Sequence, residues 1–124
     1  MKALWLVCLA ALSGCAQVNT MQLAKDRVQI TASAAPICGI VGPQNLAAQQ
    51  AAIETLRRGY DSYIIEGADH QWEPHGGHIA HSQDVVVKMF HQNEPGSAEA
   101  ISAREVLGPK WQQIINQDNQ TTCT

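Results

Sequence analysis

The sequence predicts an α+β fold in which a small antiparallel or mixed sheet of about three strands carries one long helix and a C-terminal helical segment. Three observations lead to this prediction. Apolar and polar residues alternate over residues 27–34, as is typical of a half-buried strand. Apolar residues then recur at helical spacing over residues 44–58. Two further apolar runs, residues 63–65 and 85–90, have the composition of strands.

The first strand and the helix have clear boundaries. Val28 and Ile30 lie on one face of the predicted strand, with polar residues between them. Pro43 is well placed in the first turn of the helix, where its missing N–H costs nothing, and Gly59 is expected to cap the other end.

The second strand, residues 63–65, is apolar on both faces and is therefore expected to be central in the sheet. Residues 69–82 contain proline and glycines and show no period, so we expect a loop there. After the third strand, residues 85–90, a helix is expected over residues 98–107. An amphipathic segment over residues 110–116 is expected to place Trp111 in the core.

The first sixteen residues carry the pattern of an export signal. Lys2 precedes an apolar stretch, residues 3–12, that is too short to span a bilayer, and the sequence Leu-Ser-Gly then ends at Cys15. This pattern resembles the lipobox of bacterial lipoproteins, in which the cysteine is linked to a diacylglycerol and the chain is cut before it. An ordinary signal peptide cut elsewhere and a buried apolar helix are the alternatives.

The lipobox resemblance implies three parts of the chain. Residues 1–14 would be a signal peptide, residues 15–25 a lipidated tether, and residues 26–124 a single α+β periplasmic domain. Ala16 stands where an aspartate would retain an enterobacterial lipoprotein in the inner membrane. We therefore expect anchoring in the outer membrane through Cys15, with the domain facing the periplasm.

The charge of the mature chain limits its partners. Removal of Lys2 with the signal peptide leaves seven Lys and Arg against eleven Asp and Glu, a formal net charge of −4. A mild acidic excess without a basic run argues against nucleic acid and against a polybasic contact with lipid headgroups. The acyl chains on Cys15 would be the membrane contact, and an envelope protein is the other possible partner.

The cysteines suggest one disulfide. Cys8 leaves with the signal peptide and Cys15 carries lipid, so Cys38 and Cys123 remain as an even pair in an oxidising compartment. A disulfide between them would stabilise the domain by about 4 kcal/mol on the chain-entropy model. A catalytic or metal-binding Cys38, or two free thiols, are the alternatives.

A histidine cluster is the strongest candidate for chemistry. His75, His78 and His81 flank two glycines, and imidazole is the commonest transition-metal ligand near neutral pH. The H-x-x-H spacing of these histidines brings rings together only on a helix, which Gly76 and Gly77 disfavour, and a flexible loop loses entropy when it closes around an ion. We therefore expect weak Zn(II) or Cu(II) binding at most. Nucleophile and metalloprotease motifs are absent from the sequence, so no catalytic residue and no cofactor are predicted.

Two blocks of sequence, residues 52–61 and residues 84–90 with 95–97 and 100–111, resemble a group of small proteobacterial lipoproteins of unknown function. The resemblance implies the cellular localisation and the fold but no activity. In that group the segment between the second and third strands is longer and lacks these histidines. We expect a non-enzymatic structural or partner-binding role in the envelope, with exposed Trp72 as a plausible anchor. A weak transition-metal binder is the alternative.

Overall fold

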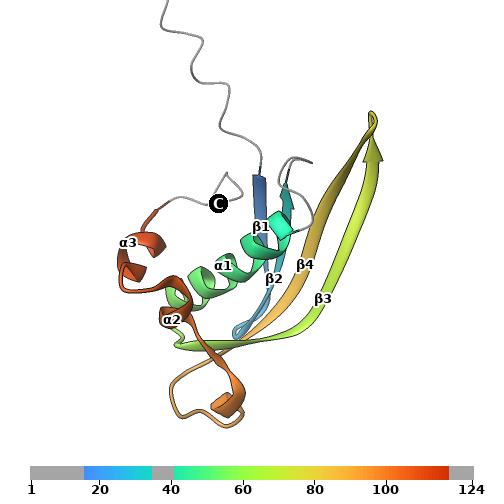
Figure 1. The fold of residues 1–124 in the computed structure, drawn as a ribbon. Coiled ribbons are helices and arrows are strands. Elements are labelled where there is room, and N and C mark those ends of the chain that lie inside the picture. The colour runs from blue at the N-terminus through green and yellow to red at the C-terminus, as the bar shows by residue number, and fades with distance from the viewer. Residues whose placement is uncertain (1–15, 35–40, 118–124) are drawn as a thin grey trace, which may run out of the picture.

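The computed structural model describes residues 16–34 and 41–117, and its strands form one antiparallel sheet with the order β1-β2-β4-β3-β5 (Figure 1). The strands are β1 (Ala16–Ala24), β2 (Arg27–Ala34), β3 (Ser62–His75), β4 (His78–Phe90) and β5 (Ile101–Ser102). The helices are α1 (Val41–Arg57), α2 (Ala103–Leu107) and α3 (Trp111–Ile115), and η2 (Ser97–Glu99) is a 3-10 turn. The side chains of His75 and His78 lie outside this description.

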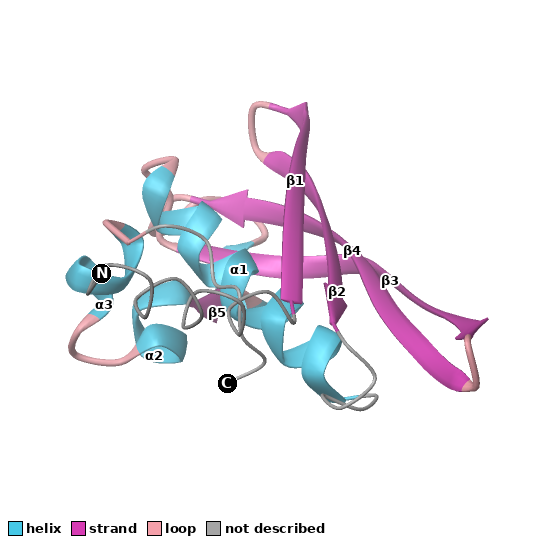
Figure 2. Ribbon diagram, turned by 90° about the horizontal axis from the view of Figure 1, so that it is seen from above, coloured by secondary structure: helices cyan, strands magenta, loops and turns pink. Residues whose placement is uncertain are grey.

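The fold has two layers. Helix α1 packs across β2 and β4, and α2 and α3 pack against α1, away from the tip of the β3–β4 hairpin (Figure 2). We call the sheet face that carries α1 the front face and the opposite one the back face. Alternation along β2 and β4 fills the front face with buried apolar side chains, because successive residues of a strand point to opposite faces. This core includes Val28, Ile30, Val85, Val87 and Met89.

The predicted sheet of about three strands is wrong, because five strands are present. Strand β1 occupies the segment for which we expected a tether. Its front-face residues Ala16 and Val18 pair with Ala34 and Ala32 and are buried. The short β5 replaces part of the helix expected over residues 98–107. Both strands lie at sheet edges, where one side of the strand has no pairing partner and burial imposes a weaker side-chain pattern than in a central strand.

The loop expected over residues 69–82 is also wrong, because these residues form a long β-hairpin. Gly76 and Gly77 have φ angles of 55° and 86°, and two central residues with positive φ are required by the type I′ turn that joins antiparallel strands. Strand β3 is not central, since β5 pairs only with Ser62 and Tyr63 and the rest of β3 forms an edge. The central strands are β2 and β4.

Helix α1 begins three residues before the predicted start and ends at Arg57, one residue before the predicted end. Gly59 follows it with a φ of 84°, and its N–H donates to the carbonyl of Leu56 at 3.1 Å. This is the cap that the sequence predicts, because glycine adopts a left-handed conformation without a steric penalty. The apolar stripe of α1 supplies Leu46 and Ala51 to the core.

Tyr63 is expected to make the folded protein less stable at high pH. Its side chain is buried, and this burial raises the pKa of the hydroxyl above its ordinary value of 10.0. The contribution of the neutral Tyr63 hydroxyl to stability is fully present below the pKa that Tyr63 has in the unfolded chain. It is lost as the pH rises through the pKa that Tyr63 has in the folded protein, because ionisation of a buried phenol favours the unfolded chain. We expect the Tyr63→Phe variant to lose less stability than the wild type between about pH 9 and pH 11. Thermal unfolding followed by circular dichroism across this range checks the prediction, and parallel curves for the two proteins would contradict it.

Candidate functional site

Three large apolar side chains remain exposed on the front face of the β3–β4 hairpin. Trp72 is 63% exposed, Ile79 is 50% exposed and Ile65 is 37% exposed. The register pairs Trp72 with His81 and Pro74 with Ile79, so Trp72 and Ile79 are diagonal neighbours on one face. We call Ile65, Trp72 and Ile79 the apolar shelf. The exposure of Trp72 agrees with the sequence-based expectation.

The apolar shelf continues toward the helix as a shallow groove. Ala47 and Ala48 of α1 form one wall, and Ile65 and Ala68 of β3 form the other. The groove has a volume of about 250 Å³, and Val85 of β4 contributes to its floor. Because β2 pairs with β4 only as far as His81, the tip of the hairpin extends beyond the neighbouring strand (Figure 1). The groove and the shelf therefore lie on the same face of the sheet, the groove at the base of the hairpin and Trp72 with Ile79 near its projecting tip.

A histidine pair lies between the groove and the tip. His70 Nε2 and His81 Nδ1 are 3.1 Å apart, and His70 Nδ1 lies 3.3 Å from Oε1 of Gln83. The two rings stack, with centroids 5.1 Å apart and an angle of 26° between the planes. The pairing follows from the hairpin register, which places His70 opposite Gln83 and next to His81 on the front face.

The structure thus joins His81 to His70, which is not one of the three histidines of the predicted site. The backbone register places positions 75 and 78 opposite each other at the turn, and their side chains lie outside the described residues. The predicted site of His75, His78 and His81 therefore stays a prediction. No group of three or more His, Cys, Asp or Glu arranged to hold an ion occurs in the part of the chain that is described.

The back face of the hairpin is acidic. Asp69 lies directly opposite Asp84 in the register, and Glu73 follows on the same face of β3. Glu66 differs from these residues because Arg27 donates to both of its carboxylate oxygens, at 3.0 and 3.2 Å. This hydrogen-bonded contact raises the pKa of the Arg27 guanidinium above its ordinary value. Within residues 16–34 and 41–117, no Lys or Arg pairs with Asp69, Glu73 or Asp84.

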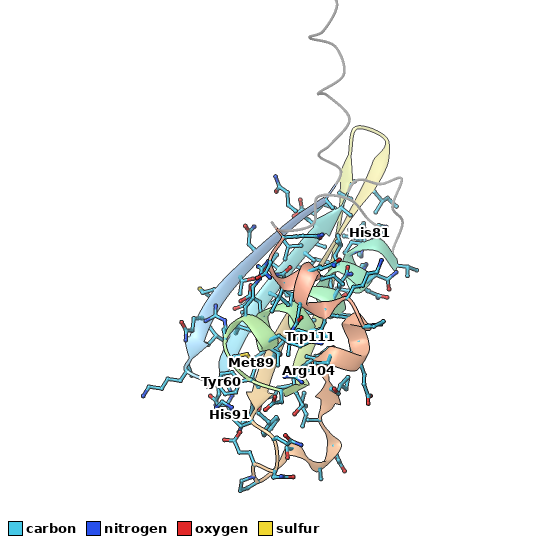
Figure 3. All side chains as sticks on the ribbon, turned by 90° about the vertical axis from the view of Figure 1, so that its left-hand side faces the viewer. Tyr60, His81, Met89, His91, Arg104 and Trp111 are labelled. Carbon is cyan, nitrogen blue, oxygen red and sulfur yellow. The ribbon has the colours of Figure 1, made fainter. Side chains whose placement is uncertain are left out.

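The opposite end of the molecule has a second, polar depression. It has a volume of about 420 Å³, and Asp61, Ser62, Ser97 and Arg104 are among the residues that line it. Figure 3 shows Arg104 near Trp111, and the guanidinium carbon lies 4.6 Å from the centroid of the indole ring. Trp111 is half-buried under this contact and does not belong to the core that we expected it to join.

The predicted lipidation site, Cys15, and the predicted disulfide partners, Cys38 and Cys123, lie outside the described residues. Both assignments remain predictions. In residues 16–34 and 41–117, no helix is long and apolar enough to cross a membrane.

Comparison with protein families, with curated proteins and with solved structures finds no match to this chain. The resemblance to small proteobacterial lipoproteins therefore stays a prediction. The geometry of the hairpin is the observation from which a function can be argued.

Proposed function

We propose that this chain is a lipoprotein anchored through Cys15 in the outer membrane, whose periplasmic domain binds a protein partner through the β3–β4 hairpin and has no catalytic role. The apolar shelf is the single observation that carries the binding role. The exposed Trp72 and Ile79 are diagonal neighbours on one face, so apolar side chains are grouped here and not scattered singly. The lipobox pattern at Cys15 supports the anchor.

The position of the shelf also favours binding over a structural role within the domain. Interface anchors are enriched in tryptophan, which buries a large area at a small cost in side-chain entropy. The groove beside Ala47 and Ala48 adds apolar surface at the base of the hairpin, and the His70–His81 pair lies between it and Trp72. The core lies on the same face under α1 and does not use these side chains.

The double variant Trp72→Ala/Ile79→Ala tests this proposal. Intact cells are treated with formaldehyde, and adducts of this protein are detected by immunoblotting. We expect adducts of wild type to be lost in the double variant, because the variant removes the apolar contact without touching the core. Val106→Ala, at an exposed apolar position of α2, is the matched control and should keep them. Adducts that are unchanged in the double variant would contradict the proposal.

Transition-metal binding is the second candidate function, favoured by the distance of 3.1 Å between His70 Nε2 and His81 Nδ1. Two nitrogens bound to one tetrahedral zinc ion lie about 3.3 Å apart, since each Zn–N bond is about 2.0–2.1 Å. The two rings thus need only a small reorientation to bind one ion. With two protein ligands in place, we expect the site to be weak.

Calorimetric titration of Zn(II) and Cu(II) into the full chain purified in detergent, without a His-tag, tests this second candidate. We expect His70→Ala to weaken any binding by about tenfold or more, because it removes one of two ligands. His91→Ala should leave binding unchanged, since His91 stacks on Tyr60 at the far end of the sheet (Figure 3). Loss of binding in His75→Asn/His78→Asn but not in His70→Ala would instead assign the metal to the cluster that the sequence predicts.

A further inference from the structure

Strand β3 has an open edge along most of its length. Its pairing with β5 ends at Tyr63, whereas its pairing with β4 continues to His75. From Ile64 onward, no strand lies on the outer side of β3 within the described parts of the chain. The backbone N–H and C=O groups of such an edge form a ready template for another strand.

Two features limit the usable part of this edge to residues 67–73. The register shift between Ile65 and Gly67 makes Glu66 a bulge, which interrupts regular pairing on one side. Pro74 has no N–H and ends regular pairing on the other side. An added strand would therefore pair between these two points, beside His70 and Trp72.

The two faces along this window differ in chemistry. On the front face, an added strand would place its side chains next to Ala68 and Trp72 and over the groove beside α1. On the back face, its side chains would lie next to Asp69 and Glu73. Residues 67–84 contain three carboxylates and no lysine or arginine.

In the described part of the chain, Asp69, Glu73 and Asp84 have no ion pair with a lysine or arginine. Like charges directly opposite each other in a sheet are destabilising, and Asp69 lies opposite Asp84. The amide of Gln71 donates to Asp69 at 3.4 Å, which is a neutral and long contact. Arg27 is held by Glu66, outside the window. A cationic side chain from a partner would therefore relieve the repulsion between Asp69 and Asp84.

We propose that the β3 edge, residues 67–73, binds an extended protein segment by strand addition, and that this segment alternates apolar and basic side chains. This inference rests on the proposed function and specifies its partner. The apolar side chains would lie on the front face against Trp72 and the groove, and the basic ones would lie on the back face against Asp69 and Glu73. Backbone hydrogen bonds would supply affinity and the two faces would supply selectivity.

A second copy of this chain fits the edge poorly. Pairing of β3 with β3 of another molecule would bring two rows of Asp69 and Glu73 side by side without a basic residue between them. Such like-charge juxtaposition costs free energy and is a means by which proteins prevent edge-to-edge association. The charge pattern thus disfavours a homodimer through β3 and favours a basic strand.

The test uses the full chain in detergent and synthetic peptides that span the window. One peptide alternates lysine and valine, a second alternates glutamate and valine, and a third is the lysine peptide N-methylated at alternate residues. We expect the lysine peptide to bind, to bind less tightly at high salt, and to slow amide hydrogen exchange in residues 67–73 as followed by NMR. The glutamate and N-methylated peptides should bind at least about fivefold less tightly.

Variants of the protein test whether the carboxylates of the β3 edge contribute to peptide binding. Asp69→Asn/Glu73→Gln should weaken binding of the lysine peptide by about fivefold. Glu66→Gln, whose carboxylate already pairs with Arg27, should leave binding unchanged and is the matched control. Equal binding of the lysine and glutamate peptides, binding without protection of residues 67–73, or no binding at all would each overturn strand addition. Loss of the cellular adducts in Trp72→Ala/Ile79→Ala would then still support a partner surface at the apolar shelf. The experiments can therefore reject strand addition without rejecting the proposed function.

Discussion

Replacement of Ile30 by alanine is expected to lower the free energy of unfolding by about 2–5 kcal/mol, which is one of the largest effects that a single side chain can have here. Ile30 lies on the central strand β2 with 0% of its surface exposed, and it pairs with Val85 in the register. Truncation removes its transfer free energy and leaves a cavity under α1. For a domain of this size the midpoint of thermal unfolding should fall on the order of 10–20 °C.

The same substitution at Ile79 is the control for this prediction. Ile79→Ala removes the same atoms from a residue that is half exposed on the hairpin, so its effect should stay within about 1 kcal/mol. Urea unfolding of the full chain in detergent measures both variants against wild type. Equal losses at Ile30 and Ile79 would mean that the front face under α1 is not the core.

Substitution of Cys15 by serine is expected to move the protein out of the membrane fraction or to leave it unprocessed. The prediction rests on the lipobox pattern that ends at Cys15, because the sulfur of this cysteine would form the thioether with the diacylglycerol. The effect should be nearly complete, since the mature chain has no basic run to hold it at the membrane.

Cell fractionation with metabolic palmitate labelling measures this effect. Cys8→Ser is the matched control, because Cys8 lies within the predicted signal peptide and its loss should leave both labelling and membrane association intact. Palmitate label that persists in Cys15→Ser would disprove the lipobox assignment, and so would label that is absent from wild type.

Side-chain alternation in the sequence predicts strand β2 and the last residues of strand β4, but not their central place in the sheet. The front-face residues Val28 and Ile30 in β2, and Val85 and Val87 in β4, are buried by α1, and burial imposes a period that can be read directly. Strand β1 escaped prediction because its apolar residues do not keep to one face: Ala16 and Val18 are buried, whereas Met21 and Leu23 are exposed. Its place in the sheet depends on backbone pairing with β2, which leaves little trace in composition.

The hairpin shows why the candidate site was only partly predictable. Gly76 and Gly77 predict a loop by composition, although two residues with positive φ are also what a tight hairpin turn requires. A loop has no strand register, and without the register the contact between His70 and His81 cannot be inferred. The exposure of Trp72 was predictable from sequence, whereas its position beside Ile79 was not.

The proposed lipid anchor and the open β3 edge together would favour capture of a partner. A lipid on Cys15 would confine the domain to a membrane surface and raise the local concentration of any partner held there. The hairpin projects from the layer of α1 and the sheet (Figure 2), and Trp72 is outside the core, so the proposed partner would reach it without displacing core side chains. On this proposal, binding and stability would depend on different side chains and could be separated by mutation.

Site-specific photo-crosslinking in intact cells tests the partner surface most directly. A photoreactive phenylalanine analogue replaces Trp72 in one strain and Gln113, an exposed residue of α3, in another. We predict a discrete protein adduct from position 72 and none from position 113, because only the first position lies on the apolar shelf. An adduct from position 113 without one from position 72, or no protein adduct from either, would contradict the account.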